Sequence, residues 1–162
     1  MRTISICATI ALMLTSGCGA RLANMTDSQK AERLARERGR LQDLTDPVDK
    51  TRSWITISQI LLDFAAGAGR EGNMKDMQSL LDQYVTAIRS ARDTIINSDR
   101  NAERDPEGYR DLEISLRGQI GQLQDLNRSL SVDDRPAVQN AIDIALSVRE
   151  QVFRRLFPQT RA

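Results

Sequence analysis

Apolar residues recur at intervals of three and four along most of this 162-residue chain. This spacing places them on one face of an α-helix, whereas a half-buried strand needs alternation by two. Four such stretches follow one another, and signals for the start of a helix precede each of them. Because an apolar helix face must be buried against another element, the pattern predicts helices packed on helices.

The first stretch starts at Asp46-Pro47, where an N-cap aspartate precedes a proline in the first turn. Between Trp54 and Ala66 it is apolar on nearly every side, which is typical of a centrally buried helix. We expect the glycine-rich segment 67–73 to end this helix and Asn73 to cap the next one.

The other three stretches each have a single apolar stripe. Asp105-Pro106 is predicted to open the third helix, and Asp133 or Asp134 with Pro136 the fourth, which Pro158 ends. The second stripe is Met77, Leu80 or Leu81, Tyr84, Ile88, Ala91 and Ile95. The third is Leu112, Leu116, Ile120, Leu123, Leu126 or Asn127, and Leu130, and the fourth is Val138, Ile142, Ala145, Val148, Val152 and Leu156.

The second and fourth stretches are similar when they are aligned with an offset of 61 positions. Met77, Gln78, Leu81, Asp82 and Val85 then face Val138, Gln139, Ile142, Asp143 and Leu146. An internal repeat explains this match, and so does convergence of two heptad patterns. The predicted fold is all-α: residues 46–158 form a four-helix bundle built from two helical hairpins.

Composition supports helices and excludes several kinds of chemistry. Aromatic residues are only 4% of the chain, and the formal charge of +1 does not suit nucleic-acid binding. The chain has no histidine, so hydrolases with a Ser-His or Cys-His pair and ferritin-like di-iron sites are excluded. The carboxylates Asp63, Asp82, Glu113 and Asp143 lie beside the apolar stripes. We therefore predict no enzyme activity, no metal site and no cofactor, and a carboxylate-based hydrolase is the least favoured alternative.

The N-terminus has the pattern of a secretory leader. Arg2 supplies a positive charge, and residues 4–14 form an apolar stretch too short to span a bilayer. The following residues, Leu14 to Cys18 (LTSGC), resemble the lipobox of bacterial lipoprotein precursors, in which small residues precede an obligatory cysteine. Thr15 stands where leucine is favoured.

The resemblance implies lipidation of Cys18 and cleavage just before it, so that residues 1–17 are a lipoprotein signal peptide. Cys7 lies inside this leader, and the mature chain therefore keeps one cysteine and has no internal disulfide. Gly19 stands where aspartate would favour retention in the inner membrane, so the outer membrane is favoured over the inner membrane. The alternative is an ordinary secretory signal that is cut nearby, with Cys18 incidental.

Residues 18–45 are expected to form a lipidated N-terminus and a charged helical tether. A helix is predicted from about Asp27, with a thin stripe of Ala31, Leu34, Arg38 and Leu41. Its excess of basic residues would attract anionic headgroups. A solvated linker helix with internal Glu/Arg pairs explains the same composition.

These observations favour a lipid-anchored protein of the bacterial cell envelope that faces the periplasm. Its predicted partners are the membrane, through Cys18, and another protein for which it acts as a non-enzymatic scaffold, adaptor or assembly factor. The alternative is a periplasmic-side protein that holds a small apolar ligand between its helices. Trp54, Phe64 and Tyr84 are the candidate ligand-binding residues, although packing in the core explains their positions equally well.

Overall fold

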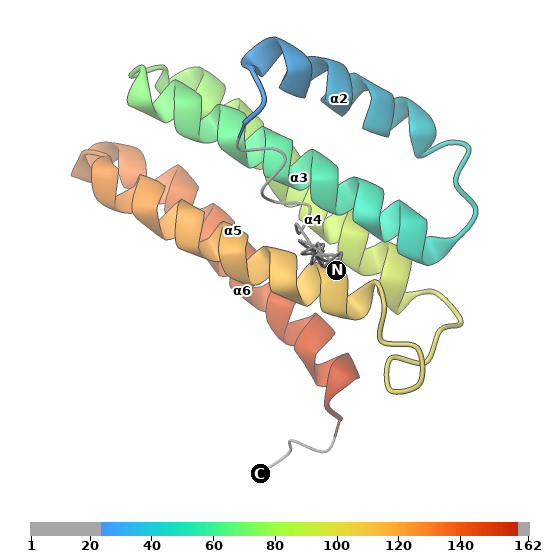
Figure 1. The fold of residues 1–162 in the computed structure, drawn as a ribbon. Coiled ribbons are helices and arrows are strands. Elements are labelled where there is room, and N and C mark those ends of the chain that lie inside the picture. The colour runs from blue at the N-terminus through green and yellow to red at the C-terminus, as the bar shows by residue number, and fades with distance from the viewer. Residues whose placement is uncertain (1–23, 159–162) are drawn as a thin grey trace, which may run out of the picture.

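The computed structural model describes residues 24–158 (Figure 1). This part of the chain consists of α-helices and one short 3-10 segment, and contains no strand. The helices are α2 (Asp27–Arg40), α3 (Pro47–Arg70), α4 (Met74–Ile96), α5 (Tyr109–Ser129) and α6 (Arg135–Leu156), with η1 (Val132–Asp134) before α6. The predicted all-α fold class is confirmed.

Three of the predicted helix starts are correct: Asp46, Asn73 and Asp134 are the N-cap residues of α3, α4 and α6. One carboxylate oxygen of Asp46, Oδ1, accepts the backbone N–H groups of Val48 at 2.7 Å and Asp49 at 3.1 Å, and Pro47 is the first residue of α3. Asn73 Oδ1 likewise accepts the N–H of Asp76 at 3.2 Å and caps α4. These side chains satisfy N–H groups that have no partner within the helix.

The start of α5 differs from the prediction at Asp105-Pro106. The helix begins at Tyr109, and its N-cap is Gly108 with a φ of 61° and no side-chain cap. A Cβ atom at Gly108 would lie 2.7 Å from Ile95 Cδ1, so the close approach of the chain to α4 requires glycine here. The segment before Tyr109 is therefore a connection packed against the end of α4.

The end of α3 differs in detail from the sequence pattern, and α6 starts at the predicted position but without the expected side-chain cap. The last turn of α3 includes Gly67 and Gly69, and the turn into α4 is made by Gly72 with a φ of 76°. Asp134 precedes α6 without a side-chain cap, because its carboxylate accepts the Ser131 hydroxyl at 2.6 Å instead.

Helices α3 and α4 pack along each other, as do α5 and α6. The two pairs meet through contacts of α4 with α6 and of α3 with α5 (Figure 1). All four helices supply side chains to one continuous apolar core. Its largest fully buried members are Tyr84, Tyr109, Ile57, Ile60, Leu61, Leu62, Met77, Leu81, Ile88, Ile95, Leu112 and Leu116.

Helix α2, which the sequence placed in a tether, packs along α3. A capping box between Thr26 and Gln29 starts it, and no residue of α2 is fully buried. Polar contacts fix its position on the body. Lys30 forms an ion pair with Asp63 at 3.2 Å, Ser53 donates to Glu37 at 2.6 Å, and Arg38 donates to Gln83 at 2.9 Å.

Candidate interaction surfaces and polar clusters

The three predicted ligand-binding residues lie in different surroundings. Tyr84 is fully buried in the core, and Phe64 is partly buried on α3. Trp54 is partly exposed and lines an open groove of about 340 Å³ between α2, α3 and α4. Ile57, Leu61 and Ala87 also line this groove, with Arg38 and Gln83. The predicted lipidation site, Cys18, lies outside the described residues.

The Tyr84 hydroxyl is buried and has no hydrogen-bond partner among the described residues. Burial raises the pKa of this phenol well above its ordinary value, because the charged form would lie in the apolar core. The Tyr109 hydroxyl, by contrast, donates to the carbonyl oxygen of Ile95 at 2.9 Å. Tyr109 therefore has a structural role at the start of α5.

A buried carboxylate joins α5 to α6, at a residue that the sequence placed beside the apolar stripe. Glu113 Oε1 accepts from Arg149 Nε at 2.9 Å, and Oε2 accepts from Arg117 Nη2 at 2.8 Å. The Glu113 side chain is 7% exposed and that of Arg149 is 33% exposed. Sequence periodicity missed this cluster, because Arg149 lies on a different helix from Glu113.

A second buried polar contact joins α3 to α5. Gln119 Nε2 donates to Ser58 Oγ and to Ser115 Oγ, both at 3.0 Å. The side-chain oxygen of Gln119, Oε1, is buried and has no hydrogen-bond partner in the described structure. The contact defines the register of α3 against α5, because both ends of the Ser58–Gln119 hydrogen bond are buried.

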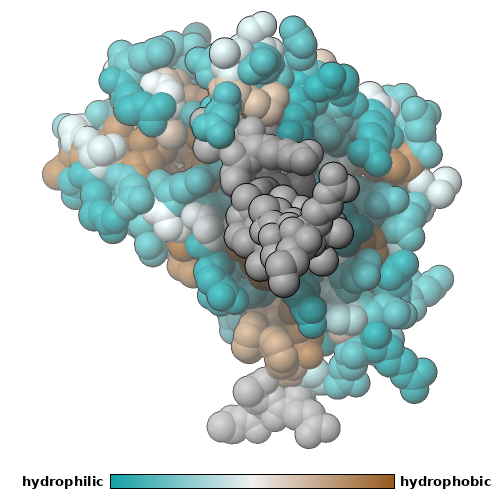
Figure 2. All heavy atoms as spheres, viewed as in Figure 1, coloured by the Kyte–Doolittle hydropathy of each residue, from teal (hydrophilic) through white to brown (hydrophobic). Residues whose placement is uncertain are grey.

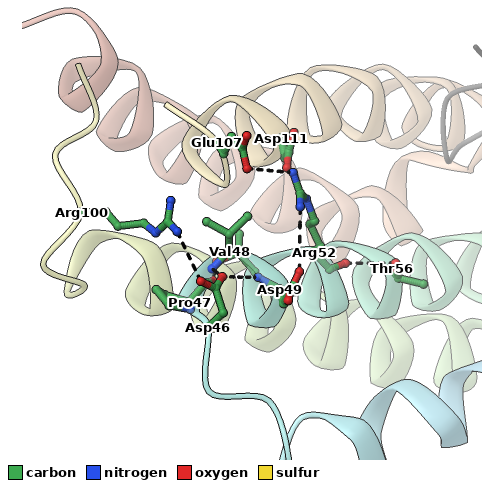
Figure 3. Close-up of polar contacts among 10 residues, drawn as sticks. Asp46, Pro47, Val48, Asp49, Arg52, Thr56, Arg100, Glu107 and Asp111 are labelled. Carbon is green, nitrogen blue, oxygen red and sulfur yellow. Dashed lines mark hydrogen bonds and ion pairs between the residues drawn. The ribbon is translucent and has the colours of Figure 1, made fainter. Parts of the chain in front are cut away.

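Charged residues at the start of α3 connect it to the first turn of α5 and to the segment before α5 (Figure 3). Arg52 Nε donates to Asp111 at 2.7 Å, and Arg100 lies 3.3 Å from the carboxylate of Asp46. The hydrogen bond to Asp111 raises the pKa of Arg52, and the backbone hydrogen bond from Asp49 lowers the pKa of Asp46. Arg52 is half exposed, so this network positions the connection without burying charge.

A second open groove, of about 500 Å³, lies between α2, α3 and α5. Its lining includes Lys30 near the start of α2, Arg70 at the end of α3 and Ser129 at the end of α5. These three helix ends therefore lie at the same end of the molecule. The groove also contains Asp63 and Asp125, so it carries both signs of charge.

Helix α6 exposes apolar side chains on its solvent side. Leu146 is 43% exposed and Phe153 is 38% exposed, and the rings of Phe153 and Phe157 lie 4.8 Å apart between centroids. A shallow groove of about 630 Å³ runs along this face between Asp143 and Phe153. In Figure 2 hydrophobic residues reach the surface near the C-terminal end of α6. We call Leu146, Phe153 and Phe157 the α6 stripe.

Comparison of the chain with protein-family models, with curated proteins and with solved structures gives no match. Within residues 24–158 no helix is long and apolar enough to cross a bilayer. In the same residues no group of three or more cysteine, aspartate and glutamate side chains is arranged to hold a metal ion.

Proposed function

We propose that this protein is a bacterial lipoprotein, anchored in the cell envelope through Cys18 and facing the periplasm from the outer membrane. We further propose that its helical body is a non-enzymatic scaffold, adaptor or assembly factor for another envelope protein. The observation that carries the proposal is the cysteine at the end of an apolar leader, preceded by small residues. Two or three acyl chains on this cysteine would hold the protein firmly in a membrane.

The short distance between Cys18 and the folded body supports this function. Cys18 lies eight positions before Thr26, the cap of α2. A fully extended chain of that length spans at most about 28 Å. Because α2 is packed along α3, a lipid at Cys18 would hold the whole body close to the membrane surface.

The anchor is tested by replacing Cys18. In Cys18→Ser we expect loss of acyl labelling and loss of the protein from the membrane fraction. Cys7→Ser is the matched control, because Cys7 lies within the leader and should leave lipidation unchanged. Acyl labelling of Cys18→Ser at the level of the unsubstituted chain would overturn the proposal.

The α6 stripe supports a protein partner. Leu146, Glu150 and Phe153 follow one another at intervals of four and three on an exposed face of α6, and the exposed Phe157 comes directly after the last residue of the helix. This is the spacing with which one helix contacts another, so the occupant we propose is an apolar helix face of an envelope protein.

We expect a photo-crosslinking residue at Leu146 to give one defined adduct in intact envelopes. The same residue at Asn140, which is also exposed on α6, should give none, and equal adducts at both positions would contradict a specific surface.

We also propose that α3 to α6 form a four-helix bundle of two hairpins, with α2 on its outer side. The hydrogen bond of 2.9 Å between Gln59 on α3 and Gln122 on α5 supports this arrangement. In a chain without Cys7 and Cys18, a short thiol crosslinker should join Gln59→Cys to Gln122→Cys. It should not join Gln59→Cys to Gln139→Cys on α6, and efficient joining of this second pair would contradict the bundle.

The groove beside Trp54 favours one alternative function, the binding of a small apolar ligand. Trp54 is the only tryptophan of the chain, so its fluorescence reports directly on this groove. Binding of a fatty acid should shift the emission of Trp54 to shorter wavelength in a saturable manner. A saturable shift would favour this alternative, and an unchanged spectrum would count against it.

A further inference from the structure

Helix α2 closes one face of α3. Ser53 and Ile60 lie about two helical turns apart on α3, and both are fully buried. Ser53 donates to Glu37 of α2 at 2.6 Å. Asp63, about one turn after Ile60, forms an ion pair with Lys30 of α2 at 3.2 Å. Because Ile60 lies between these two contacts on the same face, α2 is the element that shields it from water.

The contacts that hold α2 in this position lie close to water. No residue of α2 is fully buried, although α2 covers buried residues of α3. The side chains of Lys30 and Asp63 are 14% and 22% exposed, and the hydrogen bond from Arg38 to Gln83 is exposed. The apolar contact includes Leu34, which is only partly buried. Since water replaces contacts of this kind when they open, α2 is held more weakly than the helices that share the core.

The start of α3 is fixed by groups that do not belong to α2. Asp46 accepts the N–H groups of Val48 and Asp49, and Arg100 lies 3.3 Å from its carboxylate. The segment 41–45 between the two helices therefore serves as a pivot. Helix α2 can turn away from α3 at this pivot while the body, α3 to α6, stays folded.

The two helices run antiparallel, so the start of α2 lies towards the end of α3 (Figure 1). Lys30, in the first half of α2, contacts Asp63 in the second half of α3. A lipid on Cys18 lies within about 28 Å of Thr26, the cap of α2. The docked helix therefore holds the body to the membrane near the end of α3.

Release of α2 changes both the length and the place of this attachment. The body is then attached through Asp46, at the opposite end of α3. Asp46 lies 28 positions after Cys18. With α2 still helical and the segments on both sides of it extended, this link spans up to about 70 Å.

We propose that α2 is a releasable strap between the lipid anchor and the body. Docked, the strap keeps the body close to the membrane. Released, it lets the body reach further into the periplasm and turn about Asp46. The proposal rests on the lipid anchor proposed above, and it adds that the distance between the membrane and the body has two settings.

Two buried serines on α3 provide a matched test of release. Ser53 bonds to α2, whereas Ser58 accepts from Gln119 of α5. The described residues contain no cysteine, and the thiol of Cys18 carries the lipid, so Ser53→Cys or Ser58→Cys adds a single free thiol to the mature chain. The rate at which a maleimide modifies each thiol is measured on the lipidated protein in vesicles of phosphatidylethanolamine and phosphatidylglycerol.

We expect Ser53→Cys to react at least about tenfold faster than Ser58→Cys, because release of α2 uncovers only the first thiol. Leu34→Ala removes apolar contact between α2 and the body. It should accelerate the reaction of Ser53→Cys about tenfold and leave that of Ser58→Cys unchanged. Equal rates at the two positions, or acceleration at both by Leu34→Ala, would overturn the strap.

The same thiol tests the change in length. A bulky maleimide on Ser53→Cys occupies the place of Glu37 and prevents α2 from docking again. On a supported bilayer, neutron reflectometry should then show the body displaced outward by about 10 Å or more. The same maleimide on Ser147→Cys, which is exposed on α6, should leave the height unchanged. An unchanged height with Ser53→Cys would overturn the longer link, whereas loss of every variant from the bilayer would overturn the anchor on which it rests.

Discussion

At the scale of single residues, the core contains a polar atom that nothing in the described structure satisfies. The Tyr84 hydroxyl is fully buried without a hydrogen-bond partner. Such a hydroxyl costs about 1–3 kcal/mol. We therefore expect Tyr84→Phe, which keeps the ring, to raise the free energy of unfolding at neutral pH by about 1 kcal/mol. Urea denaturation measures this change, and a loss of stability would show that the hydroxyl has a partner.

Because Tyr84 is buried, we also expect the stability of the protein to depend on pH in the alkaline range. The unfolded chain releases the Tyr84 proton near pH 10, whereas burial raises the pKa of the folded state. Above about pH 10 the unfolded state binds fewer protons than the folded state, so stability falls as pH rises towards the folded pKa. This contribution is fully present below pH 10. Tyr84→Phe should have a shallower alkaline decline than the unsubstituted chain, and identical declines would exclude Tyr84 as the cause.

We expect truncation of two glutamates to lower the stability of the protein by different amounts. Glu113 is buried and bonded to Arg117 and Arg149, whereas Glu150 is 61% exposed and pairs with Arg154. Removal of one member of a buried pair leaves the other charge poorly compensated. Because both partners of Glu113 are partly exposed, we expect Glu113→Ala to cost about 1–3 kcal/mol and Glu150→Ala less than about 0.5 kcal/mol. Thermal unfolding compares the two, and equal losses would contradict the role of burial.

At the scale of helices, we expect substitution of two glycines of α5, its N-cap Gly108 and the internal Gly118, to have opposite effects on stability. Gly108 has a positive φ and lies against Ile95, whereas Gly118 is inside α5 with open space where a Cβ would be placed. Gly108→Ala should lower the free energy of unfolding by about 1–3 kcal/mol through backbone strain and steric overlap. Gly118→Ala should raise it by about 0.5–1 kcal/mol, because alanine favours the helix. Chemical denaturation checks both, and a neutral Gly108→Ala would mean that α5 can start differently.

The same helices show how far local sequence determines structure. Asp46 and Asn73 cap their helices through bonds to residues two and three positions later, so sequence alone predicted them. The Asp105-Pro106 signal is equally good locally, but the contact of Tyr109 and Gly108 with Ile95 determines where α5 begins. Contacts between helices similarly bury Glu113 and hold α2 on α3. Periodicity identifies a helix and its apolar side, but it contains no information about which helix will lie beside it.

For the whole molecule, one core extends through α3 to α6 while α2 adds no fully buried side chain. We therefore expect Trp54 fluorescence and far-UV circular dichroism to give one coincident unfolding transition for the core helices. Local opening should release α2 first, because few buried contacts oppose it.

Hydrogen exchange tests this order of stability. Amides of α2 should exchange at least about 100-fold faster than those at the centre of α4. Loss of the capping box in Thr26→Ala costs about 1 kcal/mol, so it should accelerate α2 exchange about fivefold and leave α4 unchanged. Acceleration in both helices would mean that α2 unfolds only together with the core. In that case a lipid anchor at Cys18 would be coupled to the folding of the entire body, and not only to the docking of its outermost helix.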